Sequence, residues 1–317
     1  MIDRRSFLGA SLAVAAGAAR AQGRVMRIVI PFAAGGVQDI LARSLSNELG
    51  AALGASVIVE NRAGAGGTIG TAFVAKAAPD GNTLVLAAAS HNINGSLHAK
   101  LAYDPQKDFT PIAHIGNAGY VLMLHPEVPA KTAGEYIRYA RANPGKLNYA
   151  TAGIGSATHL SMAYFNGLAG IDVVHVPLKA TGEAVNEVLS GRAQAVIAAN
   201  IGALPFANDK RIRLVGVTSG KRSKFLPGLP TIAETGLPGY EFDSWFGLLG
   251  PAGMPAVEVE RIHGAMAKLL RDPALLERLD KQGIEPHALS VPEFTRLLAG
   301  DFERMARVVK ASGAKVE

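Results

Sequence analysis

The chain contains no cysteine among its 317 residues. This excludes disulfide bonds, thiolate metal sites and a cysteine nucleophile. Stability must therefore come from a buried core, for which a chain of this length is sufficient. Apolar residues make up 49% of the sequence and charged residues 18%, a composition typical of globular rather than disordered proteins.

Aromatic residues are also few, at 6% with a single tryptophan. The formal net charge is +6, but the basic residues are scattered, and no basic run is longer than a pair such as Lys221-Arg222. A surface that follows nucleic-acid phosphates needs clustered basic residues with interleaved aromatics. The sequence therefore predicts no nucleic-acid partner.

No apolar run beyond the N-terminus approaches the ~20 residues that a bilayer crossing requires. The N-terminus itself has the features of an export signal. Arg4-Arg5-Ser6-Phe7-Leu8 precedes a weakly hydrophobic run over residues 9–18, and Ala19-Arg20-Ala21 supplies an A-x-A cleavage site. Paired arginines of this kind are typical of the twin-arginine route, with the general route as the alternative. We expect residues 1–21 to be removed after Ala21 and the mature chain to reach the periplasm.

Short β-rich runs alternate with helical patterns through most of the chain. This alternation predicts an α/β fold with parallel sheets and helices on both faces. The capping-box pattern Thr132-Ala133-Gly134-Glu135 opens one helix, and Ser290-Val291-Pro292-Glu293 opens another. The expected strands cover residues 25–30, 57–60, 83–88, 121–124, 147–150, 173–176, 193–198 and 242–250.

The C-terminal part changes character and is almost entirely helical after Pro251-Ala252-Gly253-Met254-Pro255. We therefore predict a lobe 1 that begins with residues 22–118, a lobe 2 over residues 119–243, and a return of the chain to lobe 1 over residues 244–317. Two-lobed α/β proteins hold their ligand between the lobes.

The turn from Pro31 to Asp39 carries the clearest functional signal. It follows the first strand and opens a helix, whose first backbone N–H groups have no partner within the helix. Those donors and the helix dipole favour an anion, and small residues such as Gly35 and Gly36 let a ligand approach the main chain. A tight structural turn, with Asp39 as a cap or dipole partner, is an equally good interpretation of this motif alone.

The segment Thr151 to His159 repeats the same logic of strand, glycines and helix start. It lacks the third glycine of a dinucleotide loop, where Thr158 stands instead. Ser156 is not in a G-x-S-x-G elbow, so a helix cap or a ligand hydrogen bond explains it better than a nucleophile. No complete catalytic set is present.

The eight histidines show no metal-ligand spacing, and packing explains most of them better than metal binding. His91 is the exception with a functional interpretation, because it follows the apolar strand Leu84 to Ala89, and the ends of parallel strands face the cleft. The sequence predicts no metal, no cofactor and no enzymatic activity.

Many ordered motifs together resemble the Bug receptors, the extracytoplasmic solute receptors of the tripartite tricarboxylate transporter family. The similarity runs from about Val25 to the C-terminus. Its anchors are residues 28–39, 59–67, 77–81, 155–156, 159–160, 175–179, 217–219, 221–222, 229–231, 236–240, 245–255 and 272–273.

The resemblance implies a two-lobed α/β periplasmic-binding-protein fold of type II, the Venus flytrap, with hinge strands between the lobes. The lobes close on a small organic carboxylate, and the receptor delivers it to the membrane permease subunits of a tripartite transporter. We expect a monomeric receptor. A receptor for a signalling partner is the alternative, and an exported α/β hydrolase is a weaker one. The resemblance places Phe32, Ala34, Gly35, Gly36, Asp39, Gly153, Gly155 and Ser156 at the ligand, and we add Gln38, His91 and Asn200.

Two departures from the family pattern affect selectivity. Val37 and Gln38 stand where family members usually carry Ser or Thr, and Asn200 ends a strand where many have Phe-Asp. Without an acidic group near Asn200, a ligand amine has no counter-charge. We therefore hypothesise a carboxylate ligand without a strongly held ammonium and with an apolar or bulky distal part.

Overall fold

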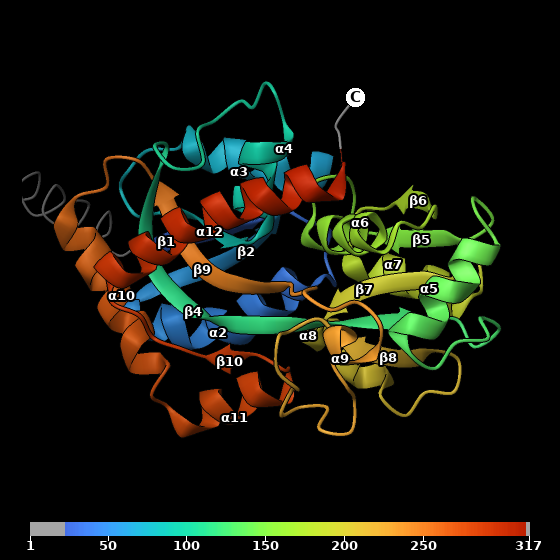
Figure 1. Cartoon of the computed structure of the whole chain (residues 1–317). Coiled ribbons are helices and arrows are strands. Elements are labelled where there is room, and N and C mark those ends of the chain that lie inside the picture. The colour runs from blue at the N-terminus through green and yellow to red at the C-terminus, as the bar shows by residue number, and fades with distance from the viewer. Residues whose placement is uncertain (1–22, 315–317) are drawn as a thin grey trace, which may run out of the picture.

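The computed structural model describes residues 23–314 (Figure 1). The predicted export signal and its cleavage site lie outside these residues. The strands are β1 Arg24–Ile30, β2 Ala55–Asn61, β3 Thr83–Ala88, β4 Phe109–Leu124, β5 Asn148–Thr151, β6 Val174–Pro177, β7 Ala195–Ala199, β8 Arg213–Val217, β9 Asp243–Pro251 and β10 Glu285–Pro286.

Helices surround these strands on both sides (Figure 1). The α-helices are α2 Val37–Leu53, α3 Thr68–Ala75, α4 Ser90–Leu97, α5 Ala133–Ala142, α6 Ala157–Ala169, α7 Thr181–Leu189, α8 Asn200–Ala203, α9 Ile232–Thr235, α10 Ala256–Leu269, α11 Pro273–Lys281 and α12 Val291–Ser312. Two short 3₁₀ turns, η1 Ala65–Gly67 and η2 Leu204–Phe206, complete the described elements.

The long strand β4 joins two groups of strands. Residues 109–119 of β4 pair with β9, which continues through β3 and β1 to β2. Residues 120–124 pair with β7 and β8, and β7 continues through β5 to β6. We call β1, β2, β3 and β9 the first strand group and β5 to β8 the second. The result is a two-lobed α/β fold, while the predicted limits of the lobes stay predictions.

The predicted parallel pairing is confirmed for the neighbours of β1 and of β5, whereas β4 and β9 pair antiparallel with their neighbours. The pairs of β1 with β2 and β3, and of β5 with β6 and β7, are parallel, as helical crossovers require. However, β4 leaves the first strand group and β9 returns to it, so the two run in opposite directions and pair antiparallel. The sequence analysis did not predict β8, β10 or α4.

The core of the first strand group shows why these segments fold as they do. On α2, Leu41, Leu45 and Leu49 recur at helical spacing and are all buried. Each such leucine stabilises the fold by about 1.5–3 kcal/mol relative to an exposed one. Residues 84–88 of β3 are buried without alternation, as expected for a strand covered on both faces.

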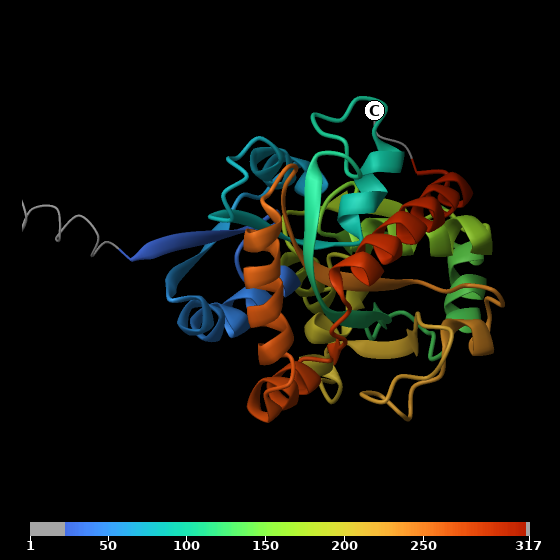
Figure 2. The same ribbon diagram turned by 90° about the vertical axis from the view of Figure 1, so that its left-hand side faces the viewer.

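The C-terminal helix α12 packs against both α4 and α6, and so touches elements beside each strand group. It crosses the upper side of the molecule in Figure 1 and runs diagonally past α4 in Figure 2. Its buried Asp301 accepts hydrogen bonds from the Trp245 indole at 2.8 Å and from the Asn92 amide at 2.9 Å. These bonds tie α12 to β9 and α4.

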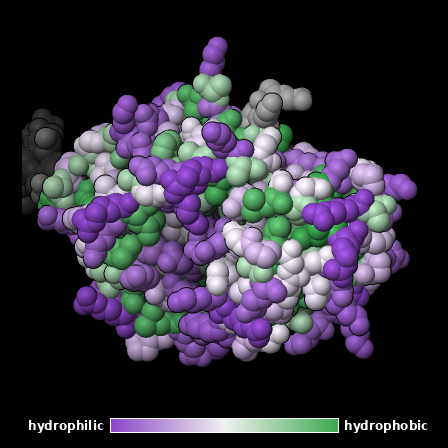
Figure 3. Space-filling model, in the orientation of Figure 1, coloured by the Kyte–Doolittle hydropathy of each residue, from purple (hydrophilic) through white to green (hydrophobic). Residues whose placement is uncertain are grey.

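The described helices include none with the length and apolar character needed to cross a membrane. The face drawn in Figure 3 is largely polar, with apolar side chains in small groups.

Candidate ligand-binding site

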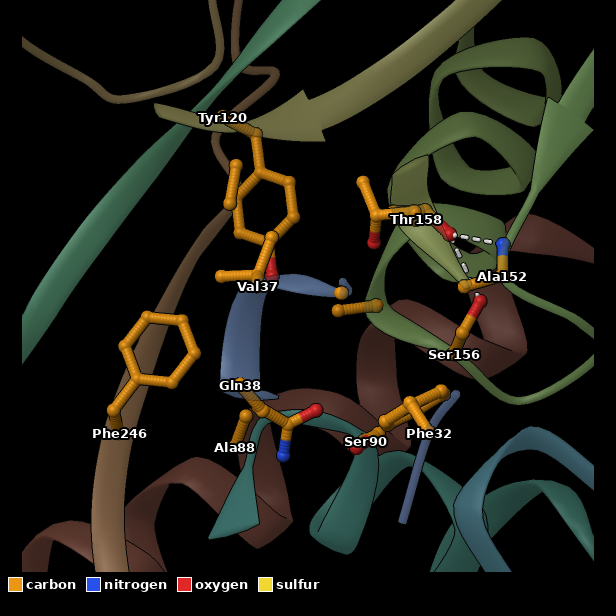
Figure 4. A pocket seen from close by; sticks show the side chains of 14 residues that line it. Phe32, Val37, Gln38, Ala88, Ser90, Tyr120, Ala152, Ser156, Thr158 and Phe246 are labelled. Atoms are coloured by element: carbon orange, nitrogen blue, oxygen red, sulfur yellow. Dashed lines mark hydrogen bonds between the residues drawn. The ribbon is translucent and has the colours of Figure 1, made fainter. Parts of the chain in front are cut away.

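A cavity lies where the two strand groups meet, between the N-terminal ends of α2 and α6 (Figure 4). The space between its wall atoms, including the mouth, is about 430 Å³, of which about 30 Å³ can hold the centre of a water molecule. That room suits about two waters. It is lined by Phe32, Gly36, Val37, Gln38, Ala88, Ser90, Tyr120, Ala152, Ser156, Ala157, Thr158, Thr181, Ala199 and Phe246.

The turn between β1 and α2 forms one wall and is fixed by side chains behind it. The buried Asp39 carboxylate accepts a hydrogen bond from the Gly35 N–H at 2.9 Å and pairs with Arg43 at 2.9 Å. Burial opposes ionisation of Asp39, but hydrogen bonds from Arg43, Gly35 and Asn61 outweigh it and lower its pKa. The charged Asp39 side chain therefore holds the turn in its conformation.

The turn between β5 and α6 forms the opposite wall. Its Ser156 hydroxyl donates to the Gly153 carbonyl at 2.6 Å, accepts from the His159 N–H at 3.2 Å, and lies 2.9 Å from the Thr158 hydroxyl. Thr158 in turn accepts from the Ala152 N–H at 2.8 Å. Because Ser156 already uses its proton on Gly153, its hydroxyl is a helix cap rather than a free donor.

Histidine rings support this second turn from behind. His159 Nδ1 accepts a hydrogen bond from the Gly155 N–H at 3.3 Å, and its ring stacks on His175 at 4.5 Å. Burial lowers the pKa of both histidines to about 4. Both rings are therefore neutral at pH 7, and no charge from them reaches the cavity.

None of the 14 lining residues carries a charge. Instead, the lining includes the first residues of several helices: Val37 of α2, Ser90 of α4, Ala157 of α6 and Thr181 of α7. The first N–H groups of a helix have no intrahelical acceptor, and the dipole makes this end positive. Convergence of these ends suits a negatively charged group held by the main chain.

The structure brings four of the predicted site residues to the cavity wall: Phe32, Gly36, Gln38 and Ser156. Five others lie in the same two turns without lining the cavity: Ala34, Gly35, Asp39, Gly153 and Gly155.

The N–H groups of the three glycines in that second set are already used. Gly35 donates to Asp39, Gly153 to the Thr151 hydroxyl at 3.1 Å, and Gly155 to His159. These glycines shape the turns, and the N–H groups at the starts of α2 and α6 are left for a ligand.

His91 and Asn200 are each one residue away from the lining. His91 Nε2 bonds the Pro105 carbonyl at 2.8 Å, and its ring packs between Tyr103 and Phe109. The strand β3 ends at Ala88 and α4 begins at Ser90, so the helix start presents Ser90 to the cavity and turns His91 into the core.

Asn200 lines a different hollow with Gly119 and Ser219, and its amide Nδ2 lies 3.4 Å from the Gly283 carbonyl. Its neighbour Ala199 lines the cavity instead.

Sequence reasoning missed Tyr120, Phe246, Ser90 and Thr181. Tyr120 sits on β4 at the point where this strand changes partners, and Phe246 lies on β9. These two residues are 126 positions apart, and no local pattern links them. Thr181 is the first residue of α7, and a start of this helix at Thr181 would have indicated its place at the cavity.

The two walls touch around the cavity. The Ala33 N–H donates to the Lys179 carbonyl at 3.3 Å, and a side-chain carbon at Gly36 would lie 3.8 Å from the Ala180 side chain. The main chain of Gly66 lies against Ile154, and Gly155 lies against the side chain of Asn94. The described conformation is therefore one in which the turns of the two lobes are in contact.

Among the described residues, no group of three or more His, Asp or Glu side chains could hold a metal ion. The fold and the inter-lobe cavity define a periplasmic binding protein: the structure of the periplasmic binding protein BugD matches with a TM-score of 0.87 and 31% identity, over 93% of this chain and 99% of BugD. The family model described as tripartite tricarboxylate transporter family receptor matches residues 41–314. The chain belongs to this family.

Two solved relatives were determined with ligands. A protein of R. palustris solved with adipate matches with a TM-score of 0.88 and 32% identity, over 92% of this chain and 99% of its own. MatC from Rhodopseudomonas palustris, with bound malate, matches with a TM-score of 0.85 and 32% identity, over 90% of this chain and 99% of its own.

Proposed function

We propose that the mature chain is a non-enzymatic periplasmic receptor that captures a small carboxylate by lobe closure. The observation that carries this proposal is the uncharged cavity on which the N-terminal ends of α2, α4, α6 and α7 converge. The relatives solved with adipate and malate support a carboxylate as the anion.

Closure follows from the same geometry. A carboxylate that bonds N–H groups of both α2 and α6 makes all its contacts only when the two turns face each other. It therefore binds the closed form better and shifts the population toward it. The hydrogen bond from Ala33 to Lys179 also stabilises the closed form and does not require a ligand.

Delivery to the permease subunits of a tripartite transporter is the second half of the proposal. It rests on membership of a transporter-receptor family and on the export signal predicted for residues 1–21. The measurement is uptake of labelled ligand by cells that carry the permease subunits, with and without the receptor. Binding without any dependence of uptake on the receptor would favour the signalling alternative.

The binding half is tested by calorimetric titration of the mature chain with mono-, di- and tricarboxylates, including adipate and malate. A ligand at ~100 times its dissociation constant stabilises the fold by about 2.7 kcal/mol, so a thermal-shift screen selects candidates. Failure of every carboxylate to bind would overturn the proposal.

A pair of variants at Gly36 sharpens the test. This residue lines the cavity, caps α2 and has φ −76°, a conformation open to any side chain. Aspartate and asparagine are both good helix caps of equal size, but only Gly36→Asp puts a negative charge in the anion site. We expect Gly36→Asp to lose roughly 100-fold or more in affinity and Gly36→Asn to lose far less. Equal losses would contradict an anion at this position.

A further inference from the structure

The orientation of the Gln38 side chain amide is fixed by the main chain. Gln38 is the second residue of α2, is 7% exposed, and lines the cavity. Its Nε2 donates to the Leu86 carbonyl at 2.7 Å. A carbonyl oxygen can only accept, so the atom facing Leu86 must be the amide nitrogen. The amide oxygen Oε1 therefore lies on the other side.

Figure 4 shows this oxygen directed toward the space between the drawn side chains, with the nitrogen pointing away. Among the described residues, the hydrogen bond of the Gln38 side chain is made by Nε2, and Oε1 has no hydrogen-bond partner. The remaining polar side chains of the lining are hydroxyls, on Ser90, Tyr120, Ser156, Thr158 and Thr181, and a hydroxyl can donate or accept. Gln38 Oε1 is the one polar side-chain atom of the lining that can only accept.

An acceptor in this position discriminates among ligand groups. A second carboxylate facing Oε1 would be repelled, and an apolar carbon packed against Oε1 would displace water from it and leave the oxygen unpaired. An ammonium would be buried without a negative partner, because the lining holds no acidic residue. A neutral hydroxyl satisfies Oε1 and carries no charge to bury.

The place of Gln38 also limits where that hydroxyl must lie on the ligand. Gln38 follows Gly36 and Val37, whose turn and helix start form the proposed anion site. The donor must therefore be within a few bonds of the bound carboxylate. The aromatic side chains of Phe32, Tyr120 and Phe246 also line the cavity and offer apolar surface to the carbon atoms of the ligand.

We propose that Gln38 is a specificity-determining residue that makes this receptor select hydroxycarboxylates over the corresponding unsubstituted and amino-substituted carboxylates. The inference rests on the proposed function, because it takes a carboxylate as the anion at the starts of α2 and α6.

The experiment compares matched ligand pairs by calorimetry on the unaltered mature chain. Suitable pairs are malate and succinate, lactate and propionate, 3-hydroxybutyrate and butyrate, and 2-hydroxyadipate and adipate. In the pair that binds best, we expect the hydroxy acid to bind about tenfold more tightly, the effect of one well-formed neutral hydrogen bond. Where malate binds, aspartate should bind more weakly than malate.

The variant Gln38→Met keeps the length of the side chain and removes its oxygen. We expect the ratio between the two ligands to fall to about one, while the unsubstituted acid keeps its affinity within about threefold. Gln106→Met is the matched control, since Gln106 is exposed and outside the cavity, and it should keep the wild-type ratio. Thermal melts check that both variants fold.

The outcomes separate the two proposals. If carboxylates bind with no preference for the hydroxy acid, the proposed role of Gln38 is wrong and the receptor function still holds. The same conclusion follows if the preference for the hydroxy acid is unchanged in Gln38→Met. Failure of all carboxylates to bind overturns the receptor function and this inference with it. The comparison on the unaltered chain decides the matter even if Gln38→Met does not fold.

Discussion

Gly66 and Ile154 belong to turns beside different strand groups and touch through their main chains. Gly66 is the middle residue of the η1 turn, and Ile154 belongs to the turn that opens α6. A side-chain carbon on Gly66 would overlap the carbonyl oxygen of Ile154. The approach of the two lobes at this point therefore requires a glycine.

This contact predicts that Gly66→Ala weakens ligand binding by hindering closure. We expect a loss of about tenfold or more in affinity, because the closed form must distort to admit the methyl group. Calorimetry with the carboxylate that the thermal-shift screen selects measures this loss. Gly54→Ala is the control. Gly54 has φ +61° and Gly66 has φ +62°, but nothing lies within 4 Å of a side-chain carbon at Gly54.

Both alanine variants should therefore share the cost of a left-handed conformation, about 1 kcal/mol of stability. Only Gly66→Ala should lose affinity. If both variants bound ligand as the unaltered chain does, closure would not depend on this contact.

A second prediction concerns Asp39, which holds the first turn through Gly35 and Arg43. Asp39→Ala should lower the free energy of unfolding by about 1–2 kcal/mol, because it removes the hydrogen bonds that the buried carboxylate accepts from Gly35 and Arg43. Asp39→Asn, which keeps an acceptor for Gly35, should lose less. Urea unfolding measures both, and an Asp39→Ala variant as stable as the unaltered chain would contradict a clamp at this position.

The pH dependence of the Asp39 contribution follows from its lowered pKa. The unfolded chain takes up the proton first as the pH falls, so protonation favours unfolding. The contribution is complete above about pH 4 and is lost as the pH falls through the folded pKa. Below that range, the difference between the unaltered chain and Asp39→Asn should shrink.

A third prediction concerns His91 and moderate acid. Burial lowers the pKa of His91 to about 4, against hydrogen bonding to Pro105 and the charge of Asp301, which raise it. As the pH falls, His91 binds its proton near pH 6.5 in the unfolded chain but only near pH 4 in the folded chain. Stability should therefore be full above pH 6.5 and fall toward pH 4, by roughly 2–3 kcal/mol from this histidine.

Urea unfolding of the unaltered chain and of His91→Gln at several pH values tests this assignment. Glutamine can still donate to the Pro105 carbonyl, but it does not titrate. The variant should lose less stability than the unaltered chain between pH 6.5 and 4. If the free energy of unfolding of both proteins fell equally between pH 6.5 and 4, His91 would not be the group that causes the loss of stability.

A fourth prediction addresses the hydrolase alternative. The Ser156 hydroxyl donates to the Gly153 carbonyl and accepts a hydrogen bond from the backbone N–H of His159, not from the His159 ring. Ser156→Ala should therefore cost about 1 kcal/mol as the loss of a helix cap. The unaltered chain should not cleave a chromogenic ester above background. Turnover that Ser156→Ala abolished would overturn the receptor assignment.

The sequence predicted much of this fold because local signals were strong. The strand–turn–helix segments at Pro31 and Thr151 were visible from small residues between apolar runs, and β3 was predicted with its observed bounds. The full length of β4 was not, because Pro111 and Gly116 resemble strand ends, whereas the structure continues the strand through register shifts at these points.

The site was predictable where it is built from consecutive residues and not where distant segments meet. Gly36, Gln38 and Ser156 belong to the turns themselves. Tyr120 and Phe246 reach the cavity only because β4 and β9 cross between the strand groups. The direction of the Gln38 amide depends on Leu86, 48 residues away, and no spacing within the sequence carries that information.

The absence of charge from the cavity wall has a consequence for how such a receptor can change. If the anion is bound by backbone N–H groups, every amino acid except proline supplies the same donor at those positions. Replacement of a lining side chain then alters the shape and polarity offered to the remainder of the ligand, while the attraction for a carboxylate persists. A new substrate range is therefore accessible through single substitutions at positions such as Val37 and Gln38, without rebuilding the part that recognises the acid.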